Sequence, residues 1–223
     1  MKLIPQDKIE EILDWAYDKA LNGTTGFDSA YKLAEDYKKD YPNDLEKQID
    51  SFINWQCAKS AISGAITSIG GFVILVATLP INITTVLAIQ FRMIITIAIL
   101  CGYDVKNDKI KTLIYACLAK ESIEKILKEA GIQITKKVGV KLIQRIPITV
   151  IRRINRFIGF KLITKFGQKG IINLGKAIPV LGMGLVAAID AVSTKKVGKF
   201  SKKTLMSKKT KNDFIEAEIV EEK

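Results

Sequence analysis

The residues of this sequence that could do chemistry are lysines and arginines placed at helical spacing. Between Glu129 and Asp190 the chain runs for 60 residues without a carboxylate, while 11 lysines and arginines are spread through an apolar background. Three groups of them recur at about one helical turn, which puts each group on one face of a helix. Their members are Lys137, Lys141, Arg145, Arg152, Arg153, Arg156, Lys161, Lys165 and Lys169. Basic faces of this kind bind anionic groups such as lipid phosphates.

Three interpretations of these basic faces compete: a solvated helix surface, contact with anionic lipid, and contact with nucleic acid or an acidic protein. A nucleic-acid interface would need exposed aromatic rings or a recognisable binding module. Phe157, Phe160 and Phe166 fall instead on the apolar sides of the predicted helices. We therefore expect anionic membrane lipid as the partner. A nucleic-acid or acidic-protein binding module is the alternative.

The absence of histidine removes most enzymatic chemistry. With no histidine in the chain, a Ser-His-Asp site, a histidine base and a histidine-ligated zinc cannot form. The sequence also lacks a phosphate-binding GxxxxGK[ST] loop and a GxSxG nucleophile motif. We expect no enzyme activity, no cofactor and no metal. A lipid-acting enzyme with a carboxylate or lysine base is the second alternative.

The charge balance and the cysteines indicate the cellular location of the protein. Residues 102–211 hold 25 basic and 6 acidic side chains, whereas the first 50 residues hold 7 basic and 12 acidic ones. The basicity is therefore confined to one part of the chain, which favours a surface that faces an anionic partner. Cys57, Cys101 and Cys117 lie in apolar runs without CxxC spacing, as expected for reduced thiols in the cytoplasm. We predict a cytoplasmic protein at the inner face of the membrane.

Apolar residues at helical spacing predict helices in the first 60 residues. The pattern indicates a helix from Asp7 to Asn22 and a second helix from Asp28, as its N-cap, to Tyr41. A third helix begins near Asp44. These helices should pack one apolar stripe each against a common core.

Two hydrophobic stretches with glycines and a central proline follow. The first lies between Lys59 and Arg92, which bracket 32 uncharged residues, and continues to Leu100; the second covers residues 170–192. Both predict helical hairpins. Arg92 interrupts the longer apolar segment, and a charge at mid-membrane costs at least about 3 kcal/mol. We expect hairpins in the protein core, with insertion into the bilayer as the alternative.

Each hydrophobic stretch contains one charged residue. Arg92 lies in the first stretch and Asp190 in the second. A buried charge without a partner is costly, so packing of the two hairpins against each other predicts a buried Arg92–Asp190 ion pair. The alternative is that each charge has a polar neighbour, such as Gln90 or Asn82. Between the hairpins, Asn107 or Asp108 begins a further helix that should run to about Ala130.

Several blocks in order resemble the EcsC family of bacterial proteins. They are YDKALNG, GFDSAYKLAEDY, WQCAKSAISGAITSIGGF, IQFRMIITIAILCGYDVKNDKIKTLIYACL, KFGQKGIINLGKAIPVLGMG and IDAVSTKKVGK, between about Asp14 and Lys199. This chain has Gly182-Met183-Gly184 where the family often has paired glycines. The resemblance implies a helical protein of a family named for a member encoded beside an ABC transporter. It brings no catalytic residues.

Together these patterns predict an all-α protein, a compact helical bundle with two glycine-punctuated hydrophobic hairpins and basic amphipathic helices. Residues 1–200 should form a single domain, and residues 201–223 a mobile charged tail. The expected function is non-enzymatic binding to an anionic lipid surface. The protein could then act as an adaptor for a membrane protein such as an ABC transporter.

Overall fold

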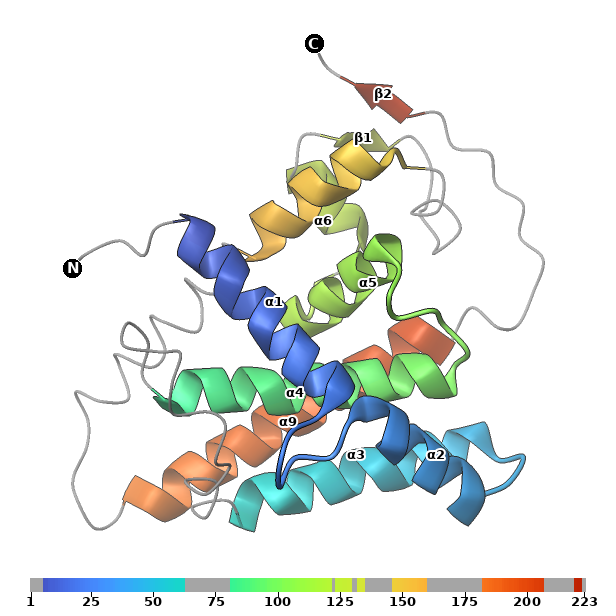
Figure 1. The fold of residues 1–223 in the computed structure, drawn as a ribbon, viewed down its shortest axis with the longest axis vertical. Coiled ribbons are helices and arrows are strands. Elements are labelled where there is room, and N and C mark those ends of the chain that lie inside the picture. The colour runs from blue at the N-terminus through green and yellow to red at the C-terminus, as the bar shows by residue number, and fades with distance from the viewer. Residues whose placement is uncertain are drawn as a thin grey trace.

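The chain folds into a bundle of helices with one short β-ribbon (Figure 1). The structure, a computed structural model, describes residues 6–62, 81–121, 123–129, 132–134, 146–159, 182–206 and 219–221. Its helices are α1 (Gln6–Asn22), α2 (Ala30–Asp40), α3 (Leu45–Ile62), α4 (Ile81–Leu100), α5 (Asp108–Ala119), α6 (Ile123–Glu129), a helix over residues 148–159, and α9 (Gly182–Met206). Strands β1 (Ile132–Ile134) and β2 (Ile219–Glu221) pair antiparallel. The predicted all-α class is confirmed.

Helix α4 is the central element of the bundle. It contacts α1, α2, α3, α5 and α9, and between residues 88 and 100 all side chains except Ile99 are buried. Phe91 has no exposed surface and contacts the rings of Tyr17 in α1 and Tyr115 in α5, with centroids 5.7 and 5.5 Å away. This part of the first hydrophobic stretch therefore lies in the protein core, as expected. Residues 63–80, which precede α4, lie outside the described part of the chain.

Helices α3 and α9 form a close antiparallel pair. Lys202 of α9 binds Glu46 and Asp50 near the start of α3, both at 2.7 Å, and Gly198 lies against Ile53 further along α3. A Cβ added to Gly198 would approach Ile53 Cγ2 to 2.9 Å, so the glycine allows this close contact. The boundary predicted at residue 200 falls inside α9, because Ser201 and Leu205 are buried. The helix therefore continues to Met206.

Two local predictions about helix ends are corrected by hydrogen bonding. Ser29, not Asp28, caps α2: the Ser29 hydroxyl accepts the Lys32 amide at 3.0 Å, while the Asp28 carboxylate binds the Lys32 ammonium. The helix that begins after Asn107 stops well before Ala130. Lys120 has φ 56°, and the amide of Glu121 donates to the Ala116 carbonyl, which closes α5 in a Schellman-type end.

Candidate functional site

The helix over residues 148–159 carries the best-defined part of the predicted basic face. Arg152, Arg153 and Arg156 are exposed on it. On its other side Ile151, Ile154 and Ile158 are buried, each at 1% exposure or less. Basic and apolar residues therefore lie on different sides of this helix, with Phe157 half-buried between them. We call Arg152, Arg153 and Arg156, together with the neighbouring exposed side chain of Ile148, the arginine surface.

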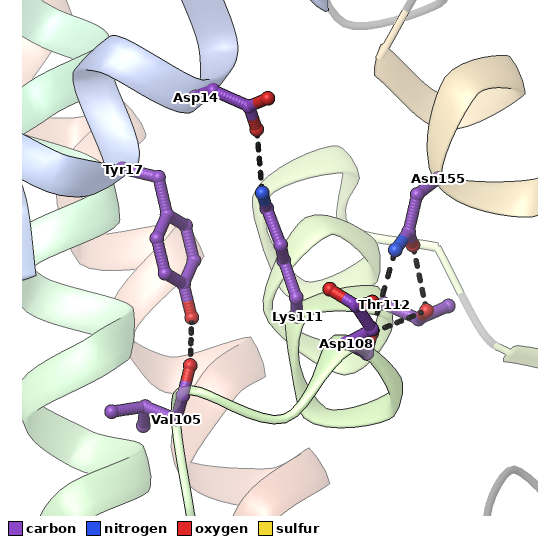
Figure 2. Close-up of polar contacts among 7 residues, drawn as sticks. All are labelled: Asp14, Tyr17, Val105, Asp108, Lys111, Thr112 and Asn155. Atoms are coloured by element: carbon purple, nitrogen blue, oxygen red, sulfur yellow. Dashed lines mark hydrogen bonds and ion pairs between the residues drawn. The ribbon is translucent and has the colours of Figure 1, made fainter. Parts of the chain in front are cut away.

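A polar contact fixes how this helix sits on the bundle. Figure 2 shows Asn155 directed toward the first turn of α5. The Thr112 hydroxyl donates to Asn155 Oδ1 at 2.6 Å, and the Asn155 amide donates to the Asp108 carbonyl at 3.4 Å. Because the amide holds one side of the helix on α5, the three arginines within three positions of Asn155 face outward.

Close packing against α1 holds the end of the same helix. A Cβ added to Gly159 would lie 2.5 Å from Leu13 Cδ1, and Leu13 is itself buried in the core. A larger residue at this position would need space that the core does not offer. Glycine therefore lets the helix approach α1 closely.

Helices α1 and α5 pack together and support the helix that carries the arginine surface. The Tyr17 hydroxyl of α1 donates to the Val105 carbonyl at 2.7 Å, just before α5 (Figure 2). The Lys111 ammonium lies 2.5 Å from Asp14 Oδ1, and 5.1 and 5.7 Å from the ring centroids of Tyr17 and Tyr115. Since Lys111 contacts both an acid and two rings, it joins α1 to α5 by charge and by cation–π attraction.

The buried tyrosines make stability depend on pH. Burial, followed by nearby Tyr31, Asp104 and Asp108, raises the pKa of Tyr17 well above its usual value of 10.0. Burial also raises the pKa of Tyr37 to about 12. In the unfolded chain both would ionise near pH 10. Their contribution is therefore complete below about pH 10 and is lost as pH rises further, because only the unfolded state releases these protons.

We expect Tyr17→Phe to weaken this alkaline loss of stability. The free energy of unfolding, measured by urea titration from about pH 8 to 11, should fall less steeply in the variant than in the parent. At neutral pH the variant should be about 1–2 kcal/mol less stable, because the buried Val105 carbonyl loses its donor. Tyr31→Phe removes only the smaller, neighbouring contribution to the raised pKa of Tyr17 and should change the pH curve much less than Tyr17→Phe. Parallel pH curves for Tyr17→Phe and the parent would contradict the prediction.

The remaining residues of the predicted basic face lie outside the described part of the chain. They are Lys137, Lys141, Arg145, Lys161, Lys165 and Lys169. Their place on the molecule stays a prediction. The arginine surface is therefore the part of the predicted basic face that the structure describes.

A second basic surface, which the predicted basic face did not include, lies on α9. Its lysines are exposed, while Val197, Ser201 and Leu205 at four-residue spacing are buried. We call the exposed set the lysine surface: Lys195, Lys196, Lys199 and Lys203. The sequence could have predicted this helix, because small or apolar residues at four-residue spacing continue one helical face beyond residue 192.

Arg92 is buried among groups that the sequence did not suggest. Its Nη1 donates to the Asp28 carbonyl at 3.2 Å, its Nη2 donates to Gln56 Oε1 at 3.3 Å, and its guanidinium carbon lies 3.7 Å from the ring centroid of Phe27. Burial lowers the pKa of Arg92 to about 10, against a smaller opposing effect of Asp28. This arrangement fastens the residue 23–29 loop and α3 to α4.

The predicted partner of Arg92 remains open. Asp190 belongs to α9, but its side chain is outside the described residues, as is that of Asn82. Gln90 is buried, and within the described structure its amide has no hydrogen-bond partner. The ion pair with Asp190 therefore stays a prediction, while the contacts with Gln56 and Phe27 are described.

The described residues could recognise a partner through their charges and through exposed apolar side chains. Among them, no group of three or more histidine, cysteine or carboxylate side chains could hold a metal ion. Nor does the same set include a helix of sufficient length and apolar character to cross a membrane. The two basic helix surfaces can present fixed guanidinium and ammonium groups to an anionic partner.

Comparison with known proteins gives one result. Residues 2–206 match the model of the EcsC protein family. No curated protein and no solved structure matches the chain. The end of the match coincides with the end of α9 at Met206.

Proposed function

Because the chain belongs to the EcsC family, we propose that it is a non-enzymatic protein that binds the anionic inner face of the membrane from the cytoplasm. The arginine surface is the contact. Such a protein could serve as an adaptor that holds a membrane protein, for example a transporter, at that face. The partner chemistry is the phosphate of anionic lipid headgroups.

The exposure and fixed direction of the three arginines carry this proposal. Arg152, Arg153 and Arg156 project from one helix whose opposite side is anchored by Asn155 and by the core isoleucines. Guanidinium groups can bind phosphate oxygens through paired hydrogen bonds. The exposed Ile148, at 42% exposure, adds an aliphatic side chain that can enter the headgroup region.

The charge distribution of the whole chain supports the same orientation. Residues 102–211 carry 25 basic and 6 acidic groups, whereas residues 1–50 carry more acids than bases. Electrostatic attraction to an anionic membrane orients a molecule with such an uneven charge so that its basic part approaches the membrane first. Each lysine or arginine close to such a surface contributes about 1 kcal/mol, and salt screens this attraction over about 8 Å.

We expect the triple variant Arg152→Glu, Arg153→Glu, Arg156→Glu to lose at least about tenfold in its partition to anionic vesicles, since three favourable charges become repulsive. Sedimentation with phosphatidylglycerol–phosphatidylcholine vesicles measures the partition. The parent should release as salt rises, and should bind phosphatidylcholine vesicles much less.

A matched control separates this surface from net charge. Lys38→Glu, Lys39→Glu and Lys106→Glu together change the charge equally at exposed positions of α2 and the α4–α5 loop, and should leave the partition nearly unchanged. If both triple variants bind alike, the arginine surface is a solvated face. If the parent binds nucleic acid but no vesicles at the same salt, the nucleic-acid interpretation replaces the proposal. Adding Lys137→Glu and Lys141→Glu to Arg152→Glu and Arg156→Glu tests the neighbouring predicted face in the same assay.

A further inference from the structure

We propose that residues 212–223, which we call the acidic segment, are an intramolecular partner of the predicted basic face and compete with anionic lipid for it. This role rests on the proposed function, because lipid is the ligand with which the segment competes. It adds a contact within the molecule that weakens binding to the membrane.

The acidic segment has the charge that a basic surface attracts. It holds five carboxylates and one lysine, whereas no carboxylate occurs between Glu129 and Asp190. Glu218, Glu221 and Glu222 lie within β2 or directly beside it in the sequence. The family model matches the chain only to residue 206. The family match therefore assigns the segment no role.

Strand β2 brings the acidic segment to the start of the predicted basic face. It pairs antiparallel with β1, with Ile134 opposite Ile219 and Ile132 opposite Glu221 (Figure 1). Three residues after Ile134 the chain reaches Lys137, the first residue of the predicted basic face. Backbone pairing therefore joins the most acidic part of the chain to the beginning of its most basic part.

Chain connectivity limits how far these opposite charges can be from each other. Lys137 follows Ile134 by three residues, and Glu218 precedes Ile219 by one. Because Ile134 and Ile219 are paired, the α-carbons of Lys137 and Glu218 are at most about 20 Å apart. Charges are screened over about 30 Å at 10 mM salt and over about 8 Å at physiological salt. The carboxylates should therefore act on the basic face most strongly at low salt.

The ribbon is short enough for this contact to be reversible. Each of its strands has three residues, and an isolated two-stranded ribbon is at best marginally stable. Lipid phosphates can therefore replace the carboxylates on the basic face. The membrane surface also repels the acidic segment, because both are negatively charged.

Neutralising the acidic segment should strengthen vesicle binding. We expect the variant Glu216→Gln, Glu218→Gln, Glu222→Gln to partition to phosphatidylglycerol–phosphatidylcholine vesicles at least about fivefold more than the parent at about 10 mM salt. Sedimentation measures the partition. The gain should shrink as salt is raised to about 0.15 M, because the carboxylates are then screened over about 8 Å.

A matched control separates the position of these charges from their number. The variant Glu35→Gln, Asp36→Asn, Asp40→Asn changes the net charge equally at exposed positions of α2. Its partition should stay within about twofold of the parent. If both triple variants gain alike, net charge explains the effect and the proposed competition is overturned.

A second variant removes the strand pairing without changing any charge. Ile219→Pro with Val220→Pro deletes two adjacent amide donors, so one ladder donor is lost whichever pairs exchange hydrogen bonds. We expect the partition to rise at least about threefold at the same low salt. In the neutralised variant the same prolines should add less than about twofold, because the segment has then lost most of its charge.

Circular dichroism checks the fold of the proline variant. Its helical signal should match that of the parent, since β2 lies outside the helices. If the signal falls, Ile219→Gly with Val220→Gly replaces the prolines, with the same expected gain in partition.

The results distinguish this competition from the proposed function. If the parent binds vesicles and the folded proline variant binds them no better, the competition is overturned and the proposed function stands. Fully additive gains from the prolines and the glutamines would also overturn it, because the strand would then act by something other than charge. If neither the parent nor any variant binds anionic vesicles, the proposed function fails and the competition with lipid fails with it.

Discussion

Phe91→Ala is expected to lower the free energy of unfolding by about 3–5 kcal/mol. Phe91 has no exposed surface and fills the space between Tyr17 of α1 and Tyr115 of α5. Removing the ring leaves a cavity at the centre of the bundle and ends two aromatic contacts. Urea denaturation followed by circular dichroism measures the loss. A protein with an ordinary stability of about 5–15 kcal/mol would become marginal.

Two further variants distinguish a cavity from a general loss of apolar contact. Phe91→Leu keeps most of the volume and should cost about 1–2 kcal/mol. Tyr31→Ala, at an aromatic residue that is 36% exposed, should change stability by less than about 0.5 kcal/mol. If Phe91→Ala costs no more than Tyr31→Ala, then α4 is not the packed centre of the protein.

Arg92→Ala is expected to cost about 3 kcal/mol. The change removes the hydrogen bonds of Arg92 to the Asp28 carbonyl and to Gln56 Oε1, and it removes the guanidinium from the ring of Phe27. Arg92→Met should cost less, about 1–2 kcal/mol, because it keeps the side-chain volume and removes the desolvated charge. Urea denaturation again gives the differences.

A double-mutant cycle tests which neighbour holds Arg92. The changes Arg92→Met and Phe27→Leu should be coupled by about 0.5–2 kcal/mol if the cation–π contact is stabilising. A cycle of Arg92→Met with Asp190→Leu tests the ion pair that the sequence suggests. Additive effects in the first cycle would show that the ring contact contributes nothing. Coupling in the second would show that Asp190 shares the site.

The sequence alone determined the features that depend on neighbouring residues. Helical periodicity was sufficient for the all-α class, and the ordered blocks of the EcsC pattern were sufficient for the family. The two sides of the helix over residues 148–159 were also predictable, because Arg152 and Arg156 repeat one turn apart opposite Ile154 and Ile158. Patterns of this range are set by the geometry of a single helix.

Features that depend on how helices cross were decided by the tertiary structure. Arg92 meets Asp28 and Gln56, which are 64 and 36 residues away in the chain, and no local spacing indicates such partners. The sequence predicts a mobile tail from residue 201, whereas Ser201 and Leu205 are buried and α9 continues to Met206. The basic residues of the chain are also divided between two helices, one packed on α5 and the other on α3. The number of charges along the chain cannot show this division, because each basic face is positioned by packing, of α9 on α3 and of Asn155 on α5.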